Sequence, residues 1–139
     1  MIVVDVETSG IDPEKHALLS IGALDFSHPE NQFYGECSVW EGAEIMDEAL
    51  VVNGFRREDI SPQKKDSEKR LLETFFTWLH HCEEQTLAGQ NPFSDTAFIS
   101  AAARRSKLSW TMSHRIVDLH TLGYTQYLQR NLSLPIKNK

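Results

Sequence analysis

The chain has 139 residues, of which 40% are apolar and 24% are charged, and this balance suits one soluble globular domain with its own core. No apolar run is long enough to span a membrane, and no signal-peptide pattern opens the chain, which argues against membrane and secreted proteins. A net charge of −6 is unlike that of proteins that bind nucleic acid passively through phosphates, although bound metal ions would reverse the local sign at an acidic site.

Extended segments open the chain. Ile2–Glu7 is rich in valine, Leu18–Phe26 is apolar with small residues, and Gln32–Trp40 alternates between polar and apolar positions. Short connections that carry Gly, Asp, Asn and Pro separate these segments. Successive strands with short connections predict an antiparallel meander.

The remainder of the chain has a mainly helical pattern. Ser67–Cys82 has the strongest periodicity, with its large apolar residues on one side, and Ser94 is a possible N-terminal cap for a later helix. We predict helices over Met46–Val52, Ser67–Cys82, Pro92–Lys107 and Arg115–Gln129, a short strand over Thr86–Gln90, and a frayed tail over Asn131–Lys139.

This order of elements predicts an α/β fold in which a mixed sheet, with three antiparallel strands first and a shorter strand later, is covered by helices. We expect residues 1–139 to form a single domain. Cys37 and Cys82 lie far apart and suggest no disulfide framework, so reduced thiols in a cytoplasmic protein are the simpler interpretation.

Asp5 and Glu7 form the first group of residues that could carry chemistry. Strand residues two apart point to the same face, so the two carboxylates are expected side by side. Like charges at that spacing repel unless a cation lies between them, and an all-oxygen site of this kind suits Mg²⁺ or Mn²⁺. The alternative is a solvated strand face with two ordinary acids, and the pair alone favours that alternative.

Thr8, Ser9 and Gly10 follow the pair directly. Small residues and a glycine allow the backbone to approach a ligand closely and to offer N–H donors to a phosphate or a sugar. The alternative is a simple turn. Together with the two acids, the six-residue run DVETSG is far more specific than either part.

Asp95 is the third acid of interest and lies in the run QNPFSDTAF. It falls in the first turn of a predicted helix, where a carboxylate also interacts favourably with the helix dipole. It is therefore either an ordinary acid at a helix N-terminus or a third metal ligand that the fold brings close to the first strand.

DVETSG and the later AGQNPFSDTAF resemble the first two motifs of the DEDD (DnaQ-like) 3′–5′ exonuclease superfamily, which includes polymerase proofreading subunits and RNase T-like enzymes. The resemblance implies an RNase H-like fold and two divalent ions. It also implies that Asp5, Glu7 and Asp95 are catalytic carboxylates that hold metal, three of the family's four. The 3′-terminal nucleotide would then lie against the backbone of residues 8–10.

The activity implied by this resemblance is two-metal hydrolysis of phosphodiester bonds at the 3′ ends of single-stranded DNA or RNA. Asn53, Phe55 and Asn91 are further substrate-binding candidates, since Asn53 and Phe55 fall in a region that lies near the terminal nucleotide in the family. Phe55 is equally well explained as a core residue. The sequence does not separate DNA from RNA, and a polymerase or other protein partner stays open.

The family's last motif carries a fourth Asp preceded by His or Tyr, and this chain has no Asp or Glu after Asp118. Arg115–Leu122 resembles the stretch before that motif, so Asp118 is a candidate for the fourth ligand that lies ahead of the family's position. His114 and His120 are better explained as surface residues, or as residues that support the site without touching its ligands, than as a general base. We therefore expect a domain that is incomplete at its C-terminus.

Two interpretations stay open at this point. The chain is either a piece of an active exonuclease or a degenerate, non-catalytic module that binds nucleic acid, nucleotides or a partner on the same fold. Loss of one ligand and of the base should lower the rate by orders of magnitude. The basic run Arg104-Arg105-Lys107 is a candidate for steering a phosphate backbone, since it lies on the same predicted helix as Asp95, although a solvated helix face is the simpler explanation.

Overall fold

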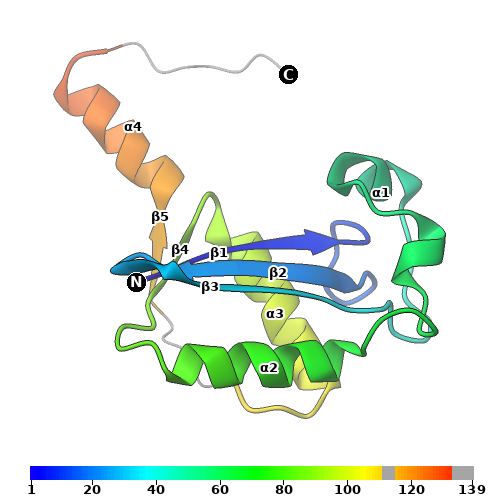
Figure 1. Cartoon of the computed structure of the whole chain (residues 1–139). Coiled ribbons are helices and arrows are strands. Elements are labelled where there is room, and N and C mark those ends of the chain that lie inside the picture. The colour runs from blue at the N-terminus through cyan, green and yellow to red at the C-terminus, as the bar shows by residue number, and fades with distance from the viewer. Residues whose placement is uncertain (111–114, 133–139) are drawn as a thin grey trace.

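The computed structural model describes residues 1–110 and 115–132, and these form a five-stranded mixed sheet with helices packed against it (Figure 1). The strands are β1 (Ile2–Thr8), β2 (Leu18–Asp25), β3 (His28–Glu36), β4 (Leu87–Gly89) and β5 (Ile116–Asp118). The helices are α1 (Asp47–Asn53), a 3₁₀ turn η1 (Arg57–Ile60), α2 (Glu68–His80), α3 (Pro92–Arg105) and α4 (Leu119–Gln129).

The strand order is β3-β2-β1-β4-β5. β1, β2 and β3 pair antiparallel, which confirms the predicted meander. β4 then pairs parallel with β1, and β5 pairs parallel with β4. The predicted mixed sheet is therefore present, with one strand more than the sequence indicated.

The third strand begins and ends about four residues earlier than predicted. The chain reverses at Phe26-Ser27, where the Asp25 carboxylate accepts a hydrogen bond from the Ser27 N–H at 2.9 Å, so β3 begins directly after the turn. Ser38 and Val39 have left the sheet, because their N–H groups donate to the carbonyls of Asp66 and Ile60. The alternation of polar and apolar residues continues through Ser38 and Val39, but the backbone partners of these residues lie in another part of the chain.

The prediction of one helix over Arg115–Gln129 was wrong at its start. Residues 116–118 form β5 along the free edge of β4, and the helix begins only at Leu119. The Asp118 side chain caps α4 by accepting from the N–H groups of His120 and Thr121. The predicted cap at Ser94 was also wrong, because α3 begins at Pro92 and Asn91 holds the N-cap position, in a left-handed conformation with φ 58° and without a capping hydrogen bond from its side chain.

The main core lies between the sheet and α2 and α3. It joins Ile2 and Val4 of β1 to Phe75 of α2 and Phe98 of α3, all buried. A smaller cluster packs α1 and η1 against the beginning of β2 through Ala17, Leu19, Leu50 and Ile60.

The last helix differs from the others in its packing. α4 has no buried residue, and Figure 1 shows it extending away from the sheet beyond β5. None of the helices in residues 1–110 and 115–132 combines the length and the apolar character that crossing a bilayer requires.

Candidate functional site

The site begins at the exposed edge of β1. β4 pairs with β1 only at Ile2 and Val3, so the edge of β1 beyond these residues has no strand neighbour on that side. The first turn of α3 takes the vacant place, and the Val6 N–H donates to the Asp95 Oδ1 at 3.0 Å. A Cβ at Gly89 would lie 2.9 Å from the Val4 carbonyl oxygen, so only glycine lets the chain turn from β4 into α3 this close to β1.

Asp5 and Glu7 lie on the opposite face of β1 from the core residues Ile2 and Val4. Strand alternation leaves Asp5 exposed and Glu7 half-buried. Partial burial and the nearby charge of Asp5 raise the pKa of Glu7, with a smaller contribution from Asp95. A hydrogen bond with Asn53 opposes this rise in the pKa.

Asp95 is only 7% exposed although it is an acid. Burial raises its pKa, the hydrogen bond from the Val6 N–H counteracts the rise, and the charge of Asp5 adds to it. A buried carboxylate near two others is costly without a cation. The fold thus brings together the three acids that the sequence singled out.

The three carboxylates do not form a closed cage. Within residues 1–110 and 115–132, no three His, Cys, Asp or Glu side chains lie close enough to hold one ion between them. Asp5, Glu7 and Asp95 nevertheless influence one another's ionisation, and mutual repulsion would keep metal-free carboxylates apart. A donor set made only of carboxylate oxygens fits a hard divalent cation, so these residues fit the metal that the family motif implies.

Residues 8–10 form a tight turn directly after the acids. The Thr8 hydroxyl donates to the Gly10 carbonyl at 2.6 Å, and the Thr8 carbonyl accepts from Asn53 Nδ2 at 2.8 Å. The His16 ring covers Gly10 so closely that a Cβ there would lie 2.0 Å from a ring carbon. The glycine is therefore needed for the packing of the turn.

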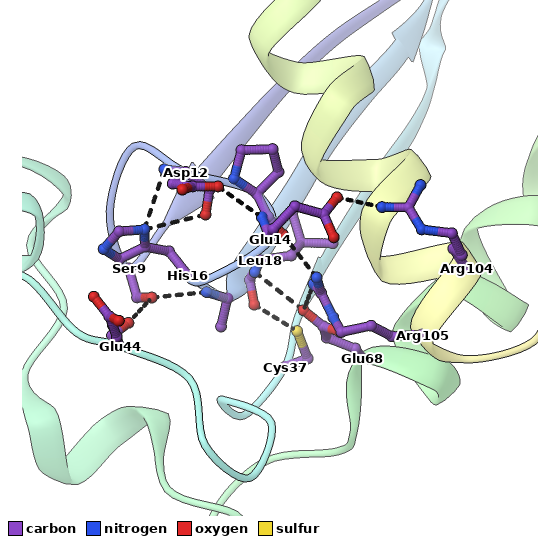
Figure 2. Close-up of polar contacts among 12 residues, drawn as sticks. Ser9, Asp12, Glu14, His16, Leu18, Cys37, Glu44, Glu68, Arg104 and Arg105 are labelled. Atoms are coloured by element: carbon purple, nitrogen blue, oxygen red, sulfur yellow. Dashed lines mark hydrogen bonds and ion pairs between the residues drawn. The ribbon is translucent and has the colours of Figure 1, made fainter.

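Ser9 is the buried polar residue of this turn. It is fully buried, and its hydroxyl donates to the Glu44 carbonyl while accepting from the Ala17 N–H, both at 2.8 Å (Figure 2). Its N–H and carbonyl bond to the backbone of Ala17 and Met46. The polar groups of Ser9 therefore already have partners within the protein, and a contact with a substrate stays a prediction.

The end of α3 fastens the loop that follows this turn. Arg105 reaches the buried carboxylate of Glu68 with two hydrogen bonds, of 2.8 and 3.1 Å, and donates to the Pro13 carbonyl at 2.7 Å. Arg104 pairs with Glu14 on the surface, as Figure 2 shows. Both arginines are therefore occupied by the protein itself, and of the predicted steering run only Lys107 is left.

Asn53 and Phe55 lie on the α1 side of the turn. Asn53 joins the end of α1 to β1 through the Thr8 carbonyl, and its Oδ1 is buried with no hydrogen-bond partner among the described residues. Phe55 packs partly against the smaller core cluster, and Lys65 Nζ lies 5.1 Å from the centre of its ring. The core explanation of Phe55 thus accounts for much of its position.

Asn91 and Asp118 meet at the ends of β4 and β5. The Asp118 carboxylate accepts from the Asn91 N–H at 3.1 Å and also caps α4. Hydrogen bonds, first that of Thr121 and then that of Asn91, lower the pKa of Asp118. These contacts account for the residue as a structural cap. His120 is exposed on α4, and His114 lies outside the described residues.

Two exposed apolar side chains near the acids were missed in the sequence. Ile11 directly follows the turn and is 82% exposed, and Phe93 lies two residues before Asp95 and is 68% exposed. Their only signal in the sequence was their position, since Ile11 directly follows DVETSG and Phe93 lies within QNPFSDTAF.

Comparison with known proteins agrees with this site. The chain is 30% identical to ribonuclease T of Vibrio campbellii, over 98% of this chain and 71% of that protein. It is 32% identical to ribonuclease T of Marinobacter nauticus, over 99% of this chain and 72% of that protein. No family model matches the chain.

Among solved structures, a product-bound exonuclease I superposes with a TM-score of 0.79 at 15% identity, over 99% of this chain. Exonuclease I of E. coli in complex with a dT13 oligonucleotide gives 0.79 at 16%. The chain spans about a third of those exonuclease I chains, 34% and 32%, and this likeness establishes the RNase H-like fold. Sequence and fold together place the chain in the ribonuclease T family of the DEDD 3′–5′ exonucleases.

Proposed function

We propose that this protein is a metal-dependent 3′–5′ exonuclease that removes nucleotides from the ends of single-stranded nucleic acid. The observation that carries the proposal is the hydrogen bond from Val6 to Asp95, which draws a buried helix acid to the strand that holds Asp5 and Glu7. A purely structural role does not need three acids in one place, since each raises the cost of the others.

In this proposal Asp5, Glu7 and Asp95 hold Mg²⁺ or Mn²⁺, with two ions in a complete site. Bound divalent ions would supply hydroxide near neutral pH and would stabilise the attacking and leaving oxygens of the phosphodiester. The protein's own contribution is to hold the carboxylates in place. Val6 orients Asp95 at 3.0 Å, and Asn53 braces the backbone at Thr8 at 2.8 Å.

The proposed contacts with the 3′-terminal nucleotide come from the turn and its neighbours. We assign backbone contacts to Thr8 and Gly10 and give Ser9 the supporting role behind them. Phe93 and Ile11 are exposed where a base could stack or wedge, which favours an unpaired strand over a duplex. Asn53, Phe55 and Asn91 are the remaining proposed substrate contacts.

The proposed substrate class is single-stranded RNA or DNA. The curated relatives are named ribonuclease T, and one related structure contains a dT13 oligonucleotide. Another is an ExoI/SSB-Ct complex, so a protein partner belongs to the proposal as well. A cytoplasmic location is supported by two buried free thiols, Cys37 and Cys82.

A second candidate is a non-catalytic binding module on the same fold. It is favoured by Asp118, whose carboxylate is engaged as a helix cap and a partner of Asn91. Such a module would bind single strands with or without metal and would leave them intact.

The experiment uses ten-nucleotide DNA and RNA strands with a 5′ label, incubated with the chain in Mn²⁺, in Mg²⁺ or in EDTA. We expect a ladder that shortens from the 3′ end in metal and intact strands in EDTA. Asp5→Asn and Glu7→Gln should abolish the ladder, whereas Asp66→Asn, the loss of an exposed acid outside the site, should leave it unchanged. Strands that stay intact in metal but are still bound would favour the binding module.

A further inference from the structure

A cavity of about 300 Å³ lies where the beginning of α2 meets the end of α3. Trp40 and Val39, from the segment that follows β3, complete its wall. Arg105 in the wall is ten residues along α3 from Asp95, which is about 15 Å at the rise of an α-helix. The cavity is therefore separate from the candidate metal site.

The charge of this cavity is positive although the whole chain is acidic. Glu68 in its wall is neutralised by the two hydrogen bonds from Arg105, and it also accepts from the Leu18 N–H at 3.2 Å. Lys69 lies 3.9 Å from Glu73, but both side chains are largely exposed and such a pair contributes little. Within the described parts of the chain Lys107 forms no ion pair, so two lysines give the cavity its net charge.

Neither lysine is at a position where the fold favours it. Lys69 lies in the first turn of α2, where the helix dipole disfavours a cation. Lys107 follows α3 with φ 57°, a left-handed conformation that glycine or asparagine adopts at lower cost. The dipole of α3 does favour a cation at this end, but Arg104 and Arg105 already supply that charge.

The rest of the wall combines donors with an apolar surface. The dipole of α2 at its N-terminus favours an anion, and Trp40 carries a buried indole N–H with no acceptor among the described residues. Val39 adds apolar surface, and the Trp40 ring packs partly against the smaller core cluster with the Arg105 guanidinium 5.0 Å from its centre. A volume of about 300 Å³ is at the lower end of small-ligand sites, which suits one nucleotide unit.

We propose that this cavity binds the phosphate group of a nucleotide, with Lys69 and Lys107 as the cations. Either a single strand or a free mononucleotide could bring this group. The strand is the expected source, and that part of the inference rests on the proposed function. A separation of about 15 Å corresponds to roughly four nucleotides at the 3.4 Å spacing of a stacked strand.

The test compares wild type with Lys69→Gln/Lys107→Gly in EDTA, so that no strand is hydrolysed. Glycine at 107 preserves the left-handed turn, and a thermal melt should show both proteins folded. The matched control is Lys64→Gln/Arg130→Gln, which removes the same charge from two exposed positions outside the cavity wall. Binding of fluorescein-labelled dT10 and U10 is followed by anisotropy across a range of salt concentrations, and AMP is titrated separately by calorimetry.

If the strand is the ligand, the cavity variant should lose about 0.7 from the slope of log K against log salt, since one phosphate is no longer neutralised, and roughly 5-fold in affinity at 0.1 M salt. The control pair should keep the wild-type slope. If AMP binds the wild type and the control but not the cavity variant, the free nucleotide is the source. If strand and AMP binding respond equally to the two pairs of substitutions, the proposal is overturned.

A further arm separates this proposal from the proposed function. The dinucleotide pTpT is too short to reach from the metal site to the cavity, so wild type and cavity variant should hydrolyse it equally in Mn²⁺. The chain could fail to hydrolyse any substrate while strand binding by the cavity variant still depends less on salt than binding by the wild type. This result would contradict the exonuclease proposal and would support the cavity site.

Discussion

Asp95 accepts a hydrogen bond from the backbone N–H of Val6 at 3.0 Å, and this bond fastens the first turn of α3 to the strand that carries Asp5 and Glu7. The same carboxylate is thus a structural acceptor and a candidate metal ligand. The two roles can be separated by substitutions that change one and keep the other.

We expect Asp95→Asn to keep the fold and to abolish metal-dependent trimming, because the amide oxygen still accepts from Val6 but carries no charge. Asp95→Ala should also lower the free energy of unfolding by about 1–3 kcal/mol, since it leaves a backbone donor without its partner. Urea denaturation together with the strand-trimming assay measures both effects. Wild-type trimming by Asp95→Asn would remove this residue from the metal site.

Glu7→Gln should stabilise the metal-free protein at neutral pH. A pKa of Glu7 that is raised on folding means that the native state binds its proton more tightly than the unfolded chain does. The ionised residue therefore lowers stability at neutral pH, and this cost disappears as the pH falls below the ordinary carboxyl pKa.

Thermal melts of wild type and Glu7→Gln in EDTA should thus differ at pH 7.5 and converge near pH 4. In Mn²⁺ at pH 7.5 the order should reverse, because the metal binds the native carboxylates and stabilises the wild type. If the two melting temperatures differed equally at both pH values, repulsion among the three acids would not contribute to the stability of the metal-free protein.

Arg105→Met and Arg104→Met form a matched pair on the last turn of α3. Arg105→Met should lower the free energy of unfolding by roughly 3–5 kcal/mol, since it leaves the Glu68 carboxylate buried and unpaired. Arg104→Met breaks only an exposed pair with Glu14 and should cost under about 1 kcal/mol. Chemical denaturation of the two variants decides the point, and equal costs would contradict the importance of burial here.

Two substitutions of Asp118 can show whether its carboxylate caps α4 or binds metal. Asn is nearly as good as Asp at the N-cap, so Asp118→Asn should preserve α4 and the trimming activity, while Asp118→Ala should fray α4. Helical circular dichroism and amide exchange of residues 119–129 report the fraying. Loss of metal-dependent activity in Asp118→Asn with α4 intact would assign the carboxylate to the metal.

The parts of the fold that could be predicted are those that local pattern determines. Alternation in β1 separates Ile2 and Val4 from Asp5, and the periodicity of α2 places Phe75 in the core. Both signals lie within a few residues of the element they describe.

The features that escaped prediction depend on distant partners. Residues 116–118 form a strand only because the edge of β4 is free to pair with them. Ser9 is buried because a segment 35 residues later supplies the Glu44 carbonyl. Arg105 looked like a surface cation, and its partner Glu68 is 37 positions away in the sequence. No local signal could have predicted these pairings.

Gly89 determines how closely the two halves of the acidic site approach. Its missing Cβ would stand 2.9 Å from the Val4 carbonyl, on the path by which β4 turns into α3. Even one added methyl group would push the helix outward from β1, and Asp95 would move with it. The precision with which this protein could hold a cation is therefore set partly by a residue that has no functional group.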